Sequence, residues 1–114
     1  MISVCMASFN GSKYIKYQLE SILLQIKSDD EIVIVDDASS DDTVSLIKSF
    51  DDNRIKVFEN ISNIGVINSF GRSISLAQGD IIFLSDQDDV WLSGKVDKVK
   101  DIFSQNSDIT LCLS

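Results

Sequence analysis

The sequence predicts an α/β fold, built as an open, mostly parallel sheet with helices on both faces. Short apolar runs alternate with segments of helical periodicity along the 114 residues, and short connections between such elements require parallel strands and right-handed crossovers. Two runs, Glu31–Asp36 and Ile81–Ser85, are nearly continuously apolar, which is typical of strands buried on both faces. The length and the 44% hydrophobic content suit a single domain over residues 1–114.

The first half of the chain predicts two strand–helix pairs. Ile2–Ser8 is a short apolar run that predicts a strand, and the turn at Asn10–Ser12 offers a helix cap. The helix that follows is expected to bury one face, made of Ile15, Leu19, Ile22, Leu23 and Ile26. After the strand at Glu31–Asp36, Ser39–Asp42 supply cap side chains for a helix expected to bury Val44, Ile47 and Phe50.

The second half repeats this alternation. Ile55–Glu59 alternates like a half-exposed strand, and the next helix is expected to bury Ile67, Phe70, Ile74 and Ala77 before it stops at Gly79. Ile81–Ser85 then predicts a buried strand. The last elements are a helix carrying Val96, Val99 and Phe103 and a fifth strand at Ile109–Leu113.

The charge balance excludes several chemistries. The chain has 18 Asp and Glu against 10 Lys and Arg, a net charge of −8, and no histidine. Without histidine there is no Ser-His-Asp or Cys-His catalysis, and a metal site made from oxygen ligands would favour Mg²⁺, Mn²⁺ or Ca²⁺. An acidic chain is also a poor nucleic-acid binder.

Cysteine usage and hydropathy bear on the compartment. Cys5 and Cys112 lie in apolar runs, which predicts buried thiols rather than a disulfide scaffold. No signal peptide or transmembrane run is visible, so we expect a cytoplasmic protein.

Three polar segments follow predicted strands, and they are expected to meet. Ala7–Gly11 follows the first strand, Asp36–Ser39 the second, and Ser85–Asp89 the fourth. In open α/β sheets, ligands bind at the carboxyl ends of the strands where the strand order reverses. With a strand order of 3-2-1-4, these three segments would surround one crevice.

The acids in two of these segments have a functional and a structural interpretation. Asp86, Asp88 and Asp89 fall within four residues after a buried strand, and a hard divalent cation would offset their repulsion; turn and cap roles are the alternative. Asp36 and Asp37 would accept hydrogen bonds from a base or a ribose. The alternative is that Asp37 bonds local backbone amides while its neighbours cap the next helix.

No glycine-rich phosphate loop follows the first strand. The segment Ser8–Ser12 reads S-F-N-G-S, which matches neither G-x-G-x-x-G nor G-x-x-x-x-G-K-[ST]. A nicotinamide cofactor and a Walker-type phosphate site are therefore unsupported. Any bound diphosphate would have to be neutralised mainly by metal.

Three ordered motifs resemble glycosyltransferase family 2, the inverting enzymes with a GT-A fold. They are VCMASFNGSKYIKYQLESILLQ, IVIVDDASSDDT and NIGVINSFGRSISLAQGDIIFLSDQDDVW, which together cover nearly the whole chain. The resemblance implies the Rossmann-like, nucleotide-sugar-binding half of such an enzyme, with a UDP- or dTDP-sugar donor and Mg²⁺ or Mn²⁺ bridging the D-x-D element and the diphosphate. D-Q-D-D-V-W is similar to bacterial polysaccharide transferases, notably rhamnosyltransferases, which implies cell-surface polysaccharide biosynthesis.

The same resemblance implies donor-binding roles in the first two motifs. Ala7 and Phe9 match the positions whose backbone and aromatic ring hold the pyrimidine. Asp37 matches the acid that contacts the base, and Asp36 lies beside it.

For the third motif the resemblance implies metal binding. Asp88 matches the direct metal ligand, and Asp86 a ribose or metal partner. Asp89 and Trp91 resemble residues that shape the loop behind the metal, and we interpret Trp91 as a packing anchor rather than as a substrate platform.

The resemblance also implies what lies outside this chain. Family members carry the general base in an acceptor-binding half, so we expect it downstream of Ser114, no catalytic residue within the chain, and donor binding with little or no transfer. The implied partners are a saccharide or lipid-linked saccharide acceptor, with peripheral association of the full-length protein at the inner face of the membrane.

Other interpretations remain open at this point. IVIVDDAS invites comparison with response-regulator receivers, but in receivers the acidic pair follows the first strand. A nucleotidyltransferase or a non-catalytic α/β interaction domain is a further alternative. We expect Arg72 and Lys13 to be solvated helix residues, with phosphate binding as their alternative, and assign no role to Tyr14 or Tyr17.

Overall fold

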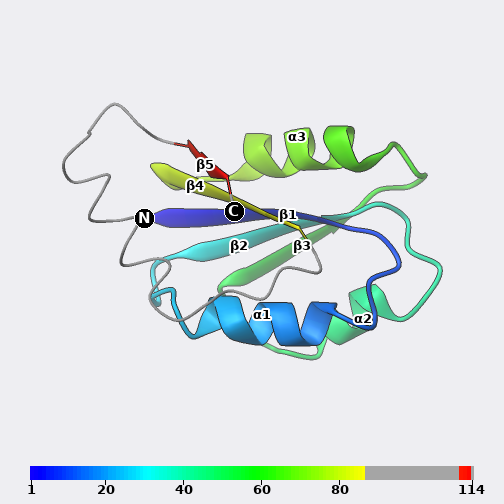
Figure 1. Ribbon diagram of the computed structural model, residues 1–114, viewed down its shortest axis with the longest axis horizontal. Coiled ribbons are helices and arrows are strands. Elements are labelled where there is room, and N and C mark those ends of the chain that lie inside the picture. Colours follow the sequence, from blue (N-terminus) through cyan, green and yellow to red (C-terminus); the bar gives the residue numbers. More distant parts are fainter. Residues whose placement is uncertain (87–110, 114) are drawn as a thin grey trace.

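The computed structural model describes residues 1–86 and 111–113, and within them five strands form one parallel sheet (Figure 1). The order is β3-β2-β1-β4-β5, which confirms the predicted α/β class and the predicted 3-2-1-4 arrangement. The bounds are β1 Ile2–Ser8, β2 Glu31–Asp36, β3 Ile55–Glu59, β4 Ile81–Asp86 and β5 Leu111–Leu113. The helix expected around Val96, Val99 and Phe103 lies outside the described residues.

Helices cover both faces of the sheet, as predicted. Helices α1 (Ile15–Leu23) and α2 (Thr43–Lys48) lie on one side, and α3 (Val66–Leu76) lies on the other (Figure 1). Because successive strand residues point to opposite faces, alternate residues of β1 join different layers. Its even-numbered residues pack in the main core with the apolar face of α1, a set that includes Ile2, Val4, Met6, Ile15, Leu19 and Ile22.

The buried face of α3 differs in part from the prediction, since Phe70, Ile74 and Ala77 are half-buried but Ile67 is not. Ile67 is 83% exposed, whereas Ser69 and Ser73 are fully buried. Small side chains let the helix approach the sheet closely, and the Cys5 thiol donates to the Ser73 carbonyl at 3.6 Å. The hydroxyls are satisfied, since Ser69 accepts from Asn60 at 3.1 Å and Ser73 donates to the Phe70 carbonyl at 2.7 Å. Hydrogen bonding therefore makes this polar contact tolerable in the interior.

The amino ends of the strands are joined by a buried carboxylate. Glu31 is 1% exposed and accepts hydrogen bonds from Ser3 Oγ at 2.5 Å, from Gln78 N at 2.7 Å and from Lys56 Nζ at 2.8 Å. Burial would raise the pKa of Glu31, but these bonds outweigh it and hold the pKa below its usual value. The carboxylate thus connects β1, β2 and β3 to the segment between α3 and β4.

Gly79 lies in that segment and does not end the helix as predicted, because α3 already ends at Leu76. A Cβ at Gly79 would lie 2.7 Å from both the Met1 carbonyl oxygen and Ser3 Oγ. The glycine is therefore required for close packing against β1. None of the helices in residues 1–86 is long and apolar enough to cross a membrane.

Candidate functional site

The acidic strand ends flank the end of β1. Ala7 pairs with Val35 of β2 and with Asp86 of β4, and Ser8 pairs with Asp36. The strand order runs 3-2-1 in one direction and 4-5 in the other, so it reverses between β1 and β4. The predicted convergence of three strand ends at this point is present in the backbone, at the place where α/β sheets bind ligands.

Asp36 is buried, and it connects the end of β1 to the loop that follows β2. Its Oδ1 accepts hydrogen bonds from Ser8 Oγ and Ser39 Oγ, both at 2.7 Å, and its Oδ2 accepts from Ser39 N at 2.9 Å. A carboxylate can accept about four hydrogen bonds, so three of these positions are already used. Ser8 and Ser39 therefore orient this acid, and Ser39, which was expected to help cap the next helix, bonds Asp36 instead.

Asp37 is also buried, but its carboxylate bonds the segment between β3 and α3 instead of the loop after β1. Its Oδ1 accepts from Ile64 N at 2.7 Å and from Asn60 Nδ2 at 3.0 Å, and its Oδ2 accepts from Gly65 N at 3.0 Å. Burial would raise the pKa of Asp37, but these bonds outweigh it and hold the pKa below its usual value. Asp37 thus bonds backbone amides, as the structural alternative expected, but they are not local ones, since they lie 27 and 28 residues away at the start of α3.

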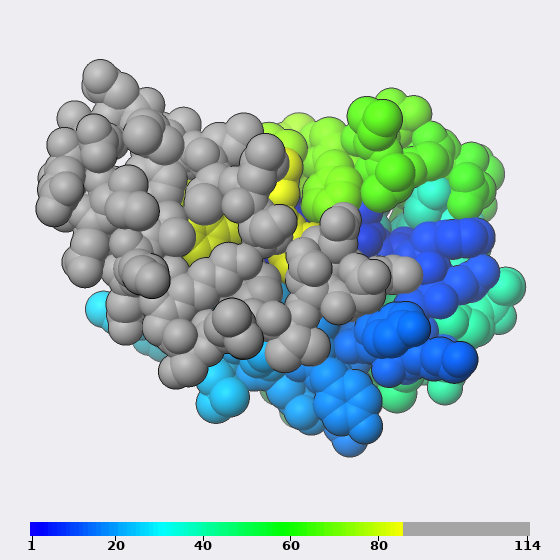
Figure 2. All heavy atoms as spheres, viewed as in Figure 1, coloured from blue at the N-terminus to red at the C-terminus, as the bar shows by residue number. Residues whose placement is uncertain are grey.

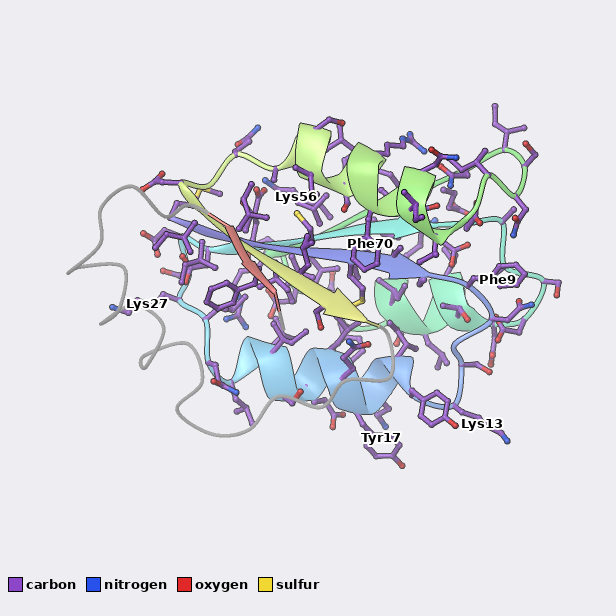
Figure 3. The ribbon with its side chains drawn as sticks, turned by 45° about the horizontal axis from the view of Figure 1, so that its top comes forward. Phe9, Lys13, Tyr17, Lys27, Lys56 and Phe70 are labelled. Atoms are coloured by element: carbon purple, nitrogen blue, oxygen red, sulfur yellow. The ribbon has the colours of Figure 1, made fainter. Side chains whose placement is uncertain are left out.

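The loop after β1 is fastened to the loop after β2. Asn10 has a positive φ of 49°. Its backbone N–H donates to Ser39 Oγ, and its side-chain Oδ1 accepts from Ser40 N, both at 2.9 Å. Gly11 N donates to Thr43 Oγ1 at 2.9 Å. These contacts leave Phe9 46% exposed, beyond the end of β1 (Figure 3).

The surface view shows the same gathering of loops. At the right-hand end of Figure 2, the dark blue atoms of the loop after β1 lie beside blue-green atoms of the β2–α2 connection and green atoms near α3. This end of the molecule therefore presents the exposed Phe9 ring close to the buried acids at the end of β2. Such a combination suits a ligand with a planar base and polar groups.

The predicted metal-binding loop falls largely beyond the described part of the chain. Asp86 is the last residue of β4, and Asp88, Asp89 and Trp91 lie outside the described residues. Within residues 1–86 and 111–113, no group of three or more His, Cys, Asp or Glu residues could hold a metal ion. The metal roles of Asp86 and Asp88 therefore stay predictions, and the acidic composition of D-Q-D-D suits a hard cation.

The basic and aromatic candidates lie at the margin of this site. Arg72 Nη1 donates to Asn60 Oδ1 at 2.6 Å, and the guanidinium lies 6.0 Å from the centre of the Phe58 ring. Arg72 therefore braces the asparagine that holds Asp37. Lys13 and Tyr17 are exposed and project outward from the start of α1 (Figure 3).

Fold and site together define the class of protein: an α/β domain of the nucleotide-binding type, with its candidate site where the strand order reverses. Residues 3–113 match the family model described as Glycosyl transferase family 2. The chain belongs to this family. This membership confirms the predicted family and displaces the receiver and nucleotidyltransferase alternatives.

Two relatives carry specific names. A UDP-Glc:alpha-D-GlcNAc-diphosphoundecaprenol beta-1,3-glucosyltransferase of Escherichia coli is 31% identical over 97 residues, which cover 85% of this chain and 38% of the relative. A dTDP-rhamnosyl transferase of Shigella flexneri is 31% identical over 112 residues, which cover 90% of this chain and 38% of the relative. The chain spans roughly a third of the length of the curated relatives it matches.

Solved structures share the fold. S. aureus TarS in complex with UDP-GlcNAc superposes with a TM-score of 0.86 at 23% identity, over 93% of this chain and 32% of TarS. A mannosyltransferase from Pyrobaculum calidifontis in complex with GDP-Man and Mn²⁺ gives a TM-score of 0.74 at 24% identity, over 81% of this chain and 28% of that chain. These similarities confirm the predicted GT-A type of α/β fold.

Proposed function

We propose that residues 1–114 form the donor-binding domain of an inverting, metal-dependent glycosyltransferase that acts in cell-surface polysaccharide biosynthesis. The donor would be a UDP- or dTDP-sugar. The observation that carries this proposal is the meeting of the ends of β1, β2 and β4, where Ala7 lies between the β2 and β4 strands and Phe9 stands exposed beyond them.

Different described residues would bind different parts of the nucleotide. The exposed ring of Phe9 would stack on the pyrimidine, beside the Ala7 backbone. Asp36 and Asp37 each accept three hydrogen bonds within the protein, so each keeps about one acceptor position for a base N–H or a ribose hydroxyl. Their internal bonds would fix the direction of that last position before the donor arrives, which lowers the cost of binding.

Asp88, with Asp86, is the proposed holder of Mg²⁺ or Mn²⁺. A bound cation of this kind would supply charge neutralisation for the departing diphosphate. Oxygen ligands in an acidic, histidine-free chain support this choice. A fold neighbour in complex with GDP-Man and Mn²⁺ is consistent with it.

For the chain itself we propose donor binding with little or no sugar transfer. A general base must be able to take a proton from the acceptor hydroxyl near neutral pH. Asp37 is poorly suited to this role, since its hydrogen bonds hold its pKa below the usual value, and Asp36 is buried with both oxygens engaged. We therefore assign neither buried acid as the base.

The acceptor and the location follow from the same proposal. A saccharide or lipid-linked saccharide would attack the anomeric carbon from the face opposite the leaving diphosphate. The E. coli relative is named for a diphosphoundecaprenol-linked acceptor, which supports a cytoplasmic protein working at the inner face of the membrane.

A thermal-shift titration tests donor binding. We expect UDP or dTDP to raise the melting temperature only when MnCl2 or MgCl2 is present, with GDP as the purine comparison. Asp88→Ala should abolish the metal-dependent shift and leave the unliganded melting temperature unchanged. Asp29→Ala, which removes an exposed acid next to the amino end of β2, should leave the shift intact. Absence of a metal-dependent shift with both pyrimidine nucleotides would contradict the donor site.

A further inference from the structure

The apolar face of α1 contains one buried side-chain amide, that of Gln18, among aliphatic side chains. Gln18 is fully buried, on the same side of the helix as Ile15, Leu19 and Ile22. Burying an amide is costly unless its polar atoms are paired. A methionine would occupy a similar volume without that cost.

One end of this amide is bonded to β4. Gln18 Nε2 donates to Ser85 Oγ at 2.9 Å, and Ser85 is itself fully buried. Ser85 pairs with Met6 of β1, and the next residue, Asp86, pairs with Ala7. The bond therefore connects α1 to β4 one residue before Asp86, the first acid of the D-Q-D-D segment.

The other end of the amide has no partner. Among the described residues, the Oε1 atom of Gln18 is the one buried side-chain oxygen or nitrogen without a hydrogen bond. An unsatisfied buried acceptor destabilises a folded protein. Buried polar atoms nearly always have a partner, so this oxygen is available to accept a hydrogen bond that the described residues do not supply.

We propose that Gln18 is a positioning residue for donor binding. Its Nε2 fixes Ser85, and through Ser85 it fixes the end of β4, whose last residue is Asp86. Its Oε1 accepts a hydrogen bond, from water or from a backbone N–H, in the donor-bound form. This inference rests on the proposed donor site and adds to it a contact from the core side of the sheet.

The test compares Gln18→Met with Leu19→Met, a neighbouring substitution on the same buried face that touches no hydrogen bond to β4. The dissociation constant for UDP in the presence of MnCl2 is measured by calorimetry, alongside the melting temperature of each variant. We expect Gln18→Met to weaken UDP binding at least tenfold, and Leu19→Met to leave it within twofold. Equal affinity for UDP in Gln18→Met and the wild type would overturn the inference.

Ser85→Ala keeps the test decisive if Gln18→Met fails to fold. It removes the other partner of the same bond, so it should weaken UDP binding in the same way. The double variant, where it folds, should lose less affinity than the sum of the two single losses, because both substitutions remove the same bond between Gln18 and Ser85. Additive losses would show that the two residues act separately and would overturn the positioning role.

Hydrogen exchange separates this inference from the donor assignment. In the unliganded chain, Gln18→Met should speed amide exchange at Ser85 and Asp86 at least tenfold, while Leu19→Met should not. If the wild type binds no UDP with MnCl2, the donor assignment fails, and the exchange rates still decide whether Gln18 fixes the end of β4. Unchanged exchange at both amides would reject that role.

Discussion

Two adjacent acids in this chain serve opposite sides of one strand. Asp36 points toward β1 and bonds Ser8, whereas Asp37 points toward β3 and α3 and bonds Asn60 and two backbone amides. The next residue, Ala38, has a positive φ of 59°, a conformation uncommon outside glycine. Separation onto different partners keeps the two carboxylates from sharing one site, where one of them would have to protonate.

The Asp37 carboxylate is expected to be worth more than an exposed aspartate. Asp37→Asn weakens charge-assisted bonds to Ile64 N and Gly65 N, and we expect it to lower the free energy of unfolding by about 1–3 kcal/mol. Urea denaturation measures this loss. Asp42→Asn is the matched control, because Asp42 precedes α2 without a side-chain cap bond, and its cost should stay near zero. Equal effects of the two substitutions would show that the bonds from Ile64 N and Gly65 N to Asp37 do not stabilise the fold.

At the scale of elements, the strands were predictable, whereas the buried face of α3 was predictable only in part. Continuous apolar runs such as Glu31–Asp36 have few alternatives to a buried strand, and the reversal point follows from topology rules. Helical periodicity placed Ile67 inside, yet Ser69 and Ser73 are buried there instead. Their partners, Cys5 and Asn60, are 68 and 9 residues away in sequence, and spacing along one helix carries no information on such contacts.

The candidate site shows the same division. The strand ends that carry Ala7, Asp36 and Asp86 were predictable, because parallel strands finish at one edge. The pairing of Asp37 with Ile64 N and Gly65 N was not, because it depends on the path of a loop that has no regular pattern.

Two glycines provide a matched test of packing at the ends and in the middle of elements. Gly79→Ala would place a methyl group 2.7 Å from the Met1 carbonyl oxygen and Ser3 Oγ, so we expect a loss of about 1–3 kcal/mol from strained packing. Gly71→Ala, inside α3 with nothing within 4 Å, should stabilise by roughly 0.5–1 kcal/mol. Thermal unfolding of both variants measures the difference. Stabilisation by both substitutions would mean that Gly79 has room to spare.

At the scale of the whole molecule, carboxylates hold separate parts of the chain in place. Hydrogen bonds keep the pKa values of Asp37 and Glu31 below their usual range despite burial. The pKa of Asp41 is lowered likewise by bonds from Thr43, against the effect of burial, and that of Asp52 by its bonds from Arg54. Arg54 in turn donates to the carbonyls of Leu23 and Ile26, at and just beyond the end of α1.

These lowered pKa values predict acid sensitivity. A carboxyl group whose folded pKa lies below its unfolded value of about 4 stabilises the fold above that value and loses this contribution as pH falls through the folded pKa. We expect the melting temperature to be nearly constant between about pH 5 and pH 7 and to fall steeply below about pH 4. Scanning calorimetry across this range measures the slope, which should be shallower in Asp37→Asn. An identical slope in that variant would contradict the assignment for Asp37.

The buried Glu31 network has a consequence for how this domain can change over evolutionary time. It secures strand register at the edge opposite the candidate site, through contacts that no loop at the site shares. Substitutions in the loops after β1, β2 and β4 can therefore accumulate without shifting the strands. The sheet can therefore stay the same in relatives whose loops at the candidate site differ.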